Sequence, residues 1–117
     1  MNEALYAHSQ FTAEGVRDVD PSTVHTHRGD VRLVDVREPA EFTGDLGHIA
    51  GASLAPLSTV VAHAATWSRD EHYVVVCRSG RRSAAAARQL AALGFGRVLN
   101  LRGGMLAWTQ AGLPVER

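Results

Sequence analysis

The 117-residue chain has a single cysteine, Cys77, and no lysine. One cysteine excludes an internal disulfide and a C-x-x-C redox pair, so covalent chemistry at Cys77 has no resolving thiol in the same chain. Without lysine, arginine alone carries the positive charge of the side chains at neutral pH. The six histidines show no metal-ligand spacing, and we expect no metal and no cofactor.

Long apolar stretches are also absent. No segment approaches the roughly 20 apolar residues of a membrane span, and residues 1–15 lack an apolar run of signal-peptide length. We therefore expect a soluble, cytoplasmic protein that does not enter a membrane. Residues 1–15 show no clear periodicity and are predicted to be a flexible arm, while residues 16–117 are long enough to form one domain with its own core.

Acidic residues are missing from residues 72–115, a segment that holds six arginines. Residues 1–71 hold eleven acidic residues and five arginines, and the whole chain carries no net charge. This asymmetry predicts a small anionic partner near Cys77. Nucleic acid is disfavoured as a partner, because the arginines are not interleaved with exposed aromatic side chains.

Strand-like apolar segments alternate with helical patterns after residue 15. A strand that is apolar throughout is typical of a parallel sheet, in which both faces are covered. Alternation of short strands and helices along the chain predicts an α/β fold, which is a parallel sheet with helices on both faces. The predicted strands are residues 16–19, 31–36, 52–55, 73–76 and 97–101, and the predicted helices are residues 21–29, 39–42, 56–66, 83–93 and 105–110.

Cys77 lies where the fourth of these strands turns into a helix, at the start of the segment CRSGRRS. Backbone N–H groups at a helix start, a glycine-containing loop and three arginines all favour the reactive thiolate. The alternative is a small cysteine buried at the end of a core strand. This interpretation does not account for the three arginines in the loop. Active sites of parallel sheets lie beyond the carboxyl ends of the strands, so Asp35 and Arg37 are expected near Cys77, mainly as an ion pair that supports the loops.

Two covalent intermediates fit this loop, a cysteine persulfide and a phosphocysteine. Cysteine phosphatases use C-x5-R, in which the arginine binds phosphate through two parallel hydrogen bonds. In this chain the sixth residue after Cys77 is Ser83, and Arg82 comes one residue too early. The shorter ring suits a single sulfur atom better than a tetrahedral phosphate.

Four segments together resemble the signatures of single-domain rhodaneses, the thiosulfate sulfurtransferases. CRSGRRS is similar to the family's active-site loop C-R-S-G-x-R-S, and LVDVREPAEF is similar to its first signature. GHIAGA resembles G-H-I-x-G-A, and LRGGMLAW followed by GLPV resembles the C-terminal signature. The resemblance implies that residues 16–117 form one rhodanese-like domain with a five-stranded parallel sheet flanked by helices.

The resemblance also implies a sulfurtransferase. Cys77 would take sulfane sulfur from thiosulfate or another sulfane donor and hold it as a persulfide. A thiophilic acceptor such as cyanide or a thiol would then remove it. Ser83 is also expected to cap the following helix. The loop residues that would bind the anionic donor and the persulfide are Arg78, Ser79, Gly80, Arg81, Arg82 and Ser83.

Two other functions stay open. One is a sulfur carrier that a partner protein loads or unloads, with little turnover of free thiosulfate. The other is a cysteine phosphatase or arsenate reductase on the same fold, which Ser83 disfavours. The loop at residues 43–46 is longer than is common in the family, and His48 is expected to pack and form hydrogen bonds rather than act as a base.

Overall fold

Six strands form one mixed sheet in the computed structural model, which describes residues 3–117. Across the sheet the order is β1-β2-β6-β5-β3-β4, and every neighbouring pair is parallel except β1 with β2. The strands are β1 (Gln10–Phe11), β2 (Arg17–Val19), β3 (Arg32–Asp35), β4 (Ser53–Leu54), β5 (Tyr73–Val76) and β6 (Val98–Leu101).

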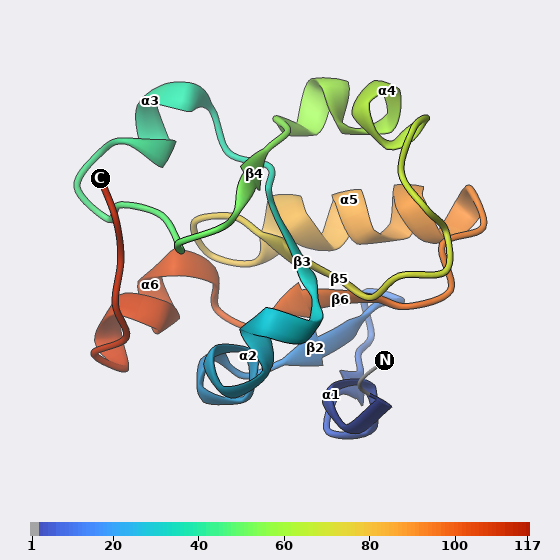
Figure 1. Cartoon of the computed structure of the whole chain (residues 1–117), viewed down its shortest axis with the longest axis horizontal. Helices are drawn as coiled ribbons and strands as arrows, with labels where there is room; N and C mark the ends of the chain where they lie inside the picture. Colours follow the sequence, from blue (N-terminus) through green and yellow to red (C-terminus); the bar gives the residue numbers. More distant parts are fainter. Residues whose placement is uncertain (1–2) are drawn as a thin grey trace.

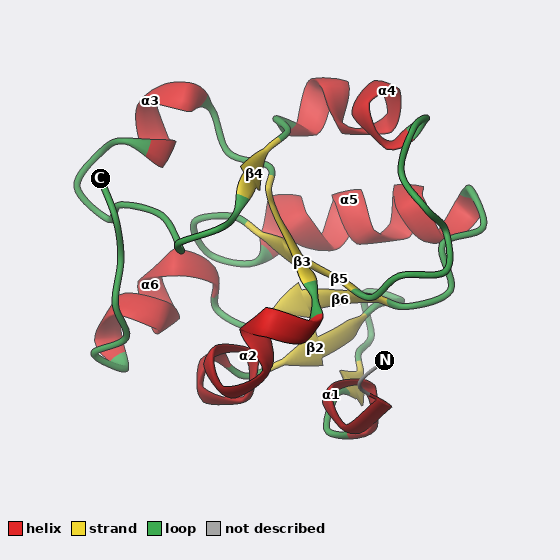
Figure 2. Cartoon of the chain, viewed as in Figure 1, coloured by secondary structure: helices red, strands yellow, loops and turns green. Residues whose placement is uncertain are grey.

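Helices cover both faces of this sheet (Figure 1; Figure 2), with α4 and α5 on one side and α2 and α6 on the other. None of the helices within residues 3–117 has the length and apolarity needed to cross a bilayer. The helices are α1 (Glu3–Ala7), α2 (Pro21–His27), α3 (Pro39–Phe42), α4 (Val60–Ala64), α5 (Arg81–Ala92) and α6 (Gly104–Gln110), with 3-10 helices at Arg28–Asp30 and Leu57–Thr59.

The central strand β5 explains how two cores form around one sheet. Successive side chains of a strand point to opposite faces. Tyr73 and Val75 pack into the cluster under α4 and α5, whereas Val74 and Val76 pack into the cluster under α2 and α6. All four side chains are fully buried, as the apolar run predicts for a strand covered on both sides.

The five predicted strands are present as β2 to β6, but the sheet has one strand more than predicted and is mixed rather than purely parallel. The additional strand, β1, has two residues, both exposed, and so carries no periodicity that the sequence could reveal. β1 and α1 lie in the segment predicted as a flexible arm, of which residues 1–2 are outside the described part. Leu5 of α1 is fully buried against the α2 and α6 side of the core.

Helix starts differ in how clearly the sequence marks them. The Asp20 side chain accepts a hydrogen bond from the backbone N–H of Thr23 at 3.2 Å, so Asp20 is the N-cap of α2. The helix predicted at residues 56–66 is divided into a 3-10 turn and the short α4. α5 begins at Arg81 with Gly80 at the N-cap position, two residues earlier than predicted. Ser83 is therefore inside the helix and does not cap it, which corrects the sequence prediction.

Candidate functional site

The candidate site forms where β5 ends and the chain loops into α5. Cys77 directly follows the last residue of β5 and is 1% exposed. The backbone N–H of Gly80 donates a hydrogen bond to Cys77 Sγ at 3.0 Å. Gly80 has φ +102°, a left-handed conformation that favours glycine. The loop thus turns one of its own amides onto the sulfur, as an anion-binding loop does.

The N-terminus of α5 adds to this environment. α5 has 12 residues and no acidic residue in its first turn, so its partial positive charge at the N-terminus is not offset by a helix carboxylate. The buried Ser83 lies in that first turn, and its Oγ is 3.3 Å from Cys77 Sγ. Both features favour negative charge on the sulfur.

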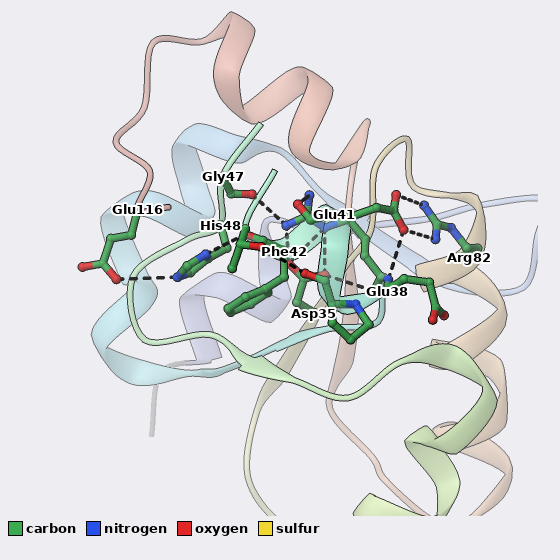
Figure 3. A network of polar contacts seen from close by, with 11 residues as sticks. Asp35, Glu38, Glu41, Phe42, Gly47, His48, Arg82 and Glu116 are labelled. Carbon is green, nitrogen blue, oxygen red and sulfur yellow. Dashed lines mark hydrogen bonds and ion pairs between the residues drawn. The ribbon is translucent and has the colours of Figure 1, made fainter. Parts of the chain in front are cut away.

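The three loop arginines have different surroundings. Arg78 and Arg81 are exposed, and their guanidinium groups form no hydrogen bond or ion pair with residues 3–117. Both terminal nitrogens of the Arg82 guanidinium donate hydrogen bonds to the carboxylate of Glu41 in α3, with Nη1–Oε1 and Nη2–Oε2 distances of 2.7 and 2.8 Å (Figure 3). The hydrogen bond from Arg82 lowers the pKa of Glu41 from 4.5 to about 2. Arg78 and Arg81 are therefore the loop arginines that can meet an anion.

Asp35, the last residue of β3, and Arg37, two residues beyond it, form a buried ion pair. Their side chains are 0% and 1% exposed, and the Arg37 Nη2–Asp35 Oδ2 distance is 2.8 Å. The guanidinium also donates to the carbonyl oxygens of Glu41 and Gly47, at 3.1 and 2.8 Å. These hydrogen bonds tie Glu41 of α3 and Gly47 to the carboxyl edge of the sheet, where Asp35 ends β3; Figure 3 labels these three residues. The ion pair reaches the Cys77 loop through the Glu41–Arg82 contact.

Asn100 of β6 joins the site, although the sequence analysis did not single it out. It is 3% exposed, and its Oδ1 accepts a hydrogen bond from Ser83 Oγ. Its Nδ2 donates to Asp18 Oδ1 at 2.9 Å and to the carbonyl of Gly80 at 3.2 Å. The one sequence signal was a polar residue within an otherwise apolar strand, VLNL.

Two glycines at the start of α6, Gly103 as the N-cap and Gly104 as the first helical residue, let that helix approach the loop. Backbone amides of Met105 and Leu106 donate to the carbonyls of Cys77 and Arg78, at 2.8 and 3.0 Å. A Cβ on Gly104 would lie 2.5 Å from both of these carbonyl oxygens, and its φ is +60°. Only glycine fits this close approach, so α6 helps to fix the shape of the loop.

His48 lies in the neighbouring network and not at the sulfur. Its Nδ1 is 2.8 Å from the carbonyl oxygen of Phe42, and the two rings are stacked with centroids 3.7 Å apart. Nε2 lies 3.7 Å from Glu116 Oε1 (Figure 3). These contacts hold α3 against the C-terminal segment. The geometry is that of a packing residue, as the sequence predicted.

A pocket of about 450 Å³ opens beside the loop, on the side that faces β2. Among the side chains that the structure describes, those of residues 5–117, no group of three or more His, Cys, Asp or Glu is placed to hold a metal ion. Positive and negative side chains share the pocket, which suits a polar ligand. It is lined by Glu14, Asp18, Ser79, Gly80, Arg81, Ala84, Arg88, Asn100 and Gly103.

Comparison with known proteins identifies relatives of this arrangement. The family model described as "Rhodanese-like domain" matches residues 21–111. A "Sulfurtransferase" from Allochromatium vinosum is 44% identical over 86 residues, which span 74% of this chain and 78% of that protein. YrkF of Bacillus subtilis, named for a role as a sulfur carrier, is 37% identical over 68% of this chain but only 42% of its own length. The crystal structure of a rhodanese-related protein from Thermoplasma volcanium has a TM-score of 0.76 at 31% identity, covering 83% of this chain and 94% of that one.

Proposed function

The chain belongs to the rhodanese-like domain family, and from this premise we propose that it is a sulfurtransferase that carries sulfur as a persulfide on Cys77. One observation carries the proposal: Cys77 Sγ accepts a hydrogen bond from the loop amide of Gly80 at 3.0 Å, at the N-terminus of a 12-residue helix. Such an amide stabilises a negatively charged sulfur and costs no reorganisation when the charge forms.

The donor in this proposal is a small anion with a sulfane sulfur, such as thiosulfate. Arg78 and Arg81 lie on the exposed side of the loop without internal partners among residues 3–117 and supply the positive charge that attracts it. Arg82 contributes to donor binding only indirectly, because its charge is balanced by the Glu41 carboxylate, which also fixes the position of its side chain. Loop amides from Arg78 to Ser83 would cradle the added sulfur.

The first half of the reaction loads the enzyme. The Cys77 thiolate attacks the outer sulfur of thiosulfate, and a new sulfur–sulfur bond forms. The bond between that sulfur and the sulfonate breaks, and sulfite leaves with the bonding electron pair. Cys77 is left as a persulfide whose negative charge rests on the outer sulfur.

The second half unloads it. Cyanide or a thiolate attacks the outer sulfur, and the bonding pair returns to Cys77 Sγ as the thiolate. The product is thiocyanate from cyanide, or a new persulfide from a thiol. Because the first product leaves before the acceptor binds, the kinetics should be ping-pong.

A sulfur carrier is the second candidate, and the similarity to YrkF favours it. In this case a partner protein's persulfide would load Cys77 and a second protein would take the sulfur. Both roles use the same chemistry at Cys77. In each, the sulfur donor must reach the Cys77 sulfur from the side of the loop, because that residue is only 1% exposed. The two roles differ in the turnover of free thiosulfate.

Phosphoryl transfer is less well supported. A phosphate on Cys77 would need an arginine that binds two of its oxygens. The arginine nearest to the phosphatase position, Arg82, has both terminal nitrogens bound to Glu41, and Ser83 occupies the position that the arginine would need. A phosphate ester would therefore lack its principal ligand.

The test is steady-state transfer from thiosulfate to cyanide, followed as thiocyanate, for the wild type and Cys77→Ser. We expect parallel double-reciprocal lines for the wild type and no transfer by the variant. The Arg28→Ala variant, which alters an exposed arginine of the 3-10 turn after α2, serves as a control and should retain the wild-type rate. A Cys77→Ser protein that keeps the wild-type rate would exclude the proposal. Little turnover with thiosulfate but rapid loading from a protein persulfide would select the carrier role.

A further inference from the structure

The hydroxyl of Ser83 has one hydrogen and two acceptors within reach. Cys77 Sγ lies 3.3 Å from Ser83 Oγ on one side, and Asn100 Oδ1 is hydrogen-bonded to the same oxygen on the other. All three side chains are 3% exposed or less, so protein groups supply most of their hydrogen bonds. Only one of the two acceptors can receive the serine hydrogen at a time.

The orientation of the Asn100 amide is fixed by its other contacts. Nδ2 donates one hydrogen to the carboxylate of Asp18 at 2.9 Å and the other to the carbonyl of Gly80 at 3.2 Å. Turning the amide over would place Oδ1 against that carboxylate and that carbonyl, which is unfavourable. Oδ1 therefore faces Ser83 and competes with the sulfur for its hydrogen.

We propose that Asn100 is a positioning residue that controls which way the Ser83 hydroxyl points, and thereby how readily the Cys77 thiolate forms. While Cys77 is a thiol, Ser83 donates to Asn100, and the S–H group donates to Ser83 Oγ. When the thiol releases its proton to water, Ser83 turns its hydrogen to the sulfur, and Asn100 Oδ1 loses its donor. Forming the thiolate thus includes the cost of one buried hydrogen bond.

Other charged groups also act on the sulfur, and they stay in place when Asn100 is changed. Asp18 is the charge closest to Asn100, and Arg102 Nε lies 3.9 Å from Asp18 Oδ2, which balances that carboxylate. Gly80 O keeps the backbone amide of Ala84 as a donor at 3.2 Å. The charged groups around the loop are Arg78, Arg81, Arg82 and Arg88 on the loop and α5, Glu14 before β2, Asp18 on β2, Arg102 after β6, Glu41 on α3, and Asp35 at the end of β3 with Arg37 after it.

The experiment measures the rate of alkylation of Cys77 by iodoacetamide against pH, in a four-member cycle of wild type, Asn100→Leu, Ser83→Ala and the double variant. The inference rests on the proposed role of Cys77 as a nucleophile, but alkylation needs no sulfur donor, so it can fail or succeed independently of sulfur transfer. Leucine is close to asparagine in size and removes the competing oxygen. Asn100→Val, which suits a strand, gives the same test if leucine is not accommodated.

We expect Asn100→Leu to move the midpoint of the alkylation profile to lower pH by roughly 0.5 to 1, the equivalent of one neutral hydrogen bond. In the Ser83→Ala background the same substitution should leave the midpoint where it was. Asp18→Asn, which removes the charge but keeps an oxygen for Asn100 Nδ2, should move the midpoint equally with and without Ser83. A shift for Asn100→Leu that is equal in both backgrounds, or that goes to higher pH, would overturn the proposal.

Discussion

Two arginines at opposite ends of β3 allow a direct test of what burial does to an ion pair. Arg37, beyond the carboxyl end, pairs with Asp35, and the two side chains are 1% and 0% exposed. Arg32, at the other end, pairs with Glu71, and the two side chains are 60% and 42% exposed. We predict that replacing each arginine by methionine, which has a similar length and no charge, will have very different effects.

The magnitude follows from what each substitution leaves behind. Arg37→Met leaves the buried Asp35 carboxylate with the backbone N–H of residue 37 as a donor, at 3.1 Å, and removes the donors to the carbonyls of Glu41 and Gly47. Removing one partner of a buried pair costs about 3–5 kcal/mol of stability. Removing one partner of an exposed pair costs about 0–1 kcal/mol, because water solvates the charge that remains.

Equilibrium urea unfolding, followed by circular dichroism under identical conditions, measures the change in free energy of unfolding for Arg37→Met and for Arg32→Met. The thermal midpoint of Arg37→Met should also fall by more than about 10 °C for a chain of this size. Arg37→Lys should recover part of the loss, because it restores the charge but not the planar fork of donors. An Arg37→Met protein that loses no more stability than Arg32→Met would refute the claim that this pair supports the site.

Three further predictions concern the loop itself. Glu41→Gln should lower the free energy of unfolding by about 1 kcal/mol at neutral pH, a value reduced for solvent screening because the side chains of Glu41 and Arg82 are 31% and 37% exposed. Since the pKa of Glu41 is lowered from 4.5 to about 2, this difference from the wild type should shrink as the pH falls through that interval, and a constant difference in urea titrations would contradict it. Arg78→Ala should raise the KM for thiosulfate roughly two- to fivefold with little change in kcat, and an unchanged KM would exclude Arg78 from donor binding. Gly104→Ala should cost more than about 2 kcal/mol in urea unfolding, because its Cβ would lie 2.5 Å from the backbone carbonyl oxygen of Cys77; a loss below about 0.5 kcal/mol would show that the loop yields easily.

The parts of the fold that the sequence could predict are those whose causes are local. β5 was predicted because burial on both faces requires an unbroken apolar run. The start of α2 at Pro21 matches the prediction because its determinants, a capping Asp20 and a proline in the first turn, are adjacent in the sequence. The loop of Cys77 was predicted for the same reason, since its glycine, its arginines and the following helix are contiguous. The two-residue β1 was missed because it is set by pairing with β2 and by a contact between Gln10 and Arg102, and a local sequence pattern shows neither.

The parts of the site that escaped prediction depend on contacts between distant residues. Glu41 and Arg82 are 41 residues apart, and Asn100 is 82 residues from Asp18. Nothing within a local segment marks such a pair, because each member looks like an ordinary polar residue of its own element. The capping role expected for Ser83 was wrong for a related reason. A serine near a helix start resembles a cap, and only the position of Asn100 and Cys77 around it reveals its buried contacts.

The measurement that tests the central claim most directly is the intact mass of the purified protein after incubation with thiosulfate, before and after addition of cyanide, with Cys77→Ser alongside. The account predicts that the wild type gains the mass of one sulfur atom, that cyanide removes it, and that the variant gains nothing. A wild-type protein that gains no sulfur from thiosulfate or from a protein persulfide, or a Cys77→Ser variant that gains it, would contradict persulfide chemistry at Cys77.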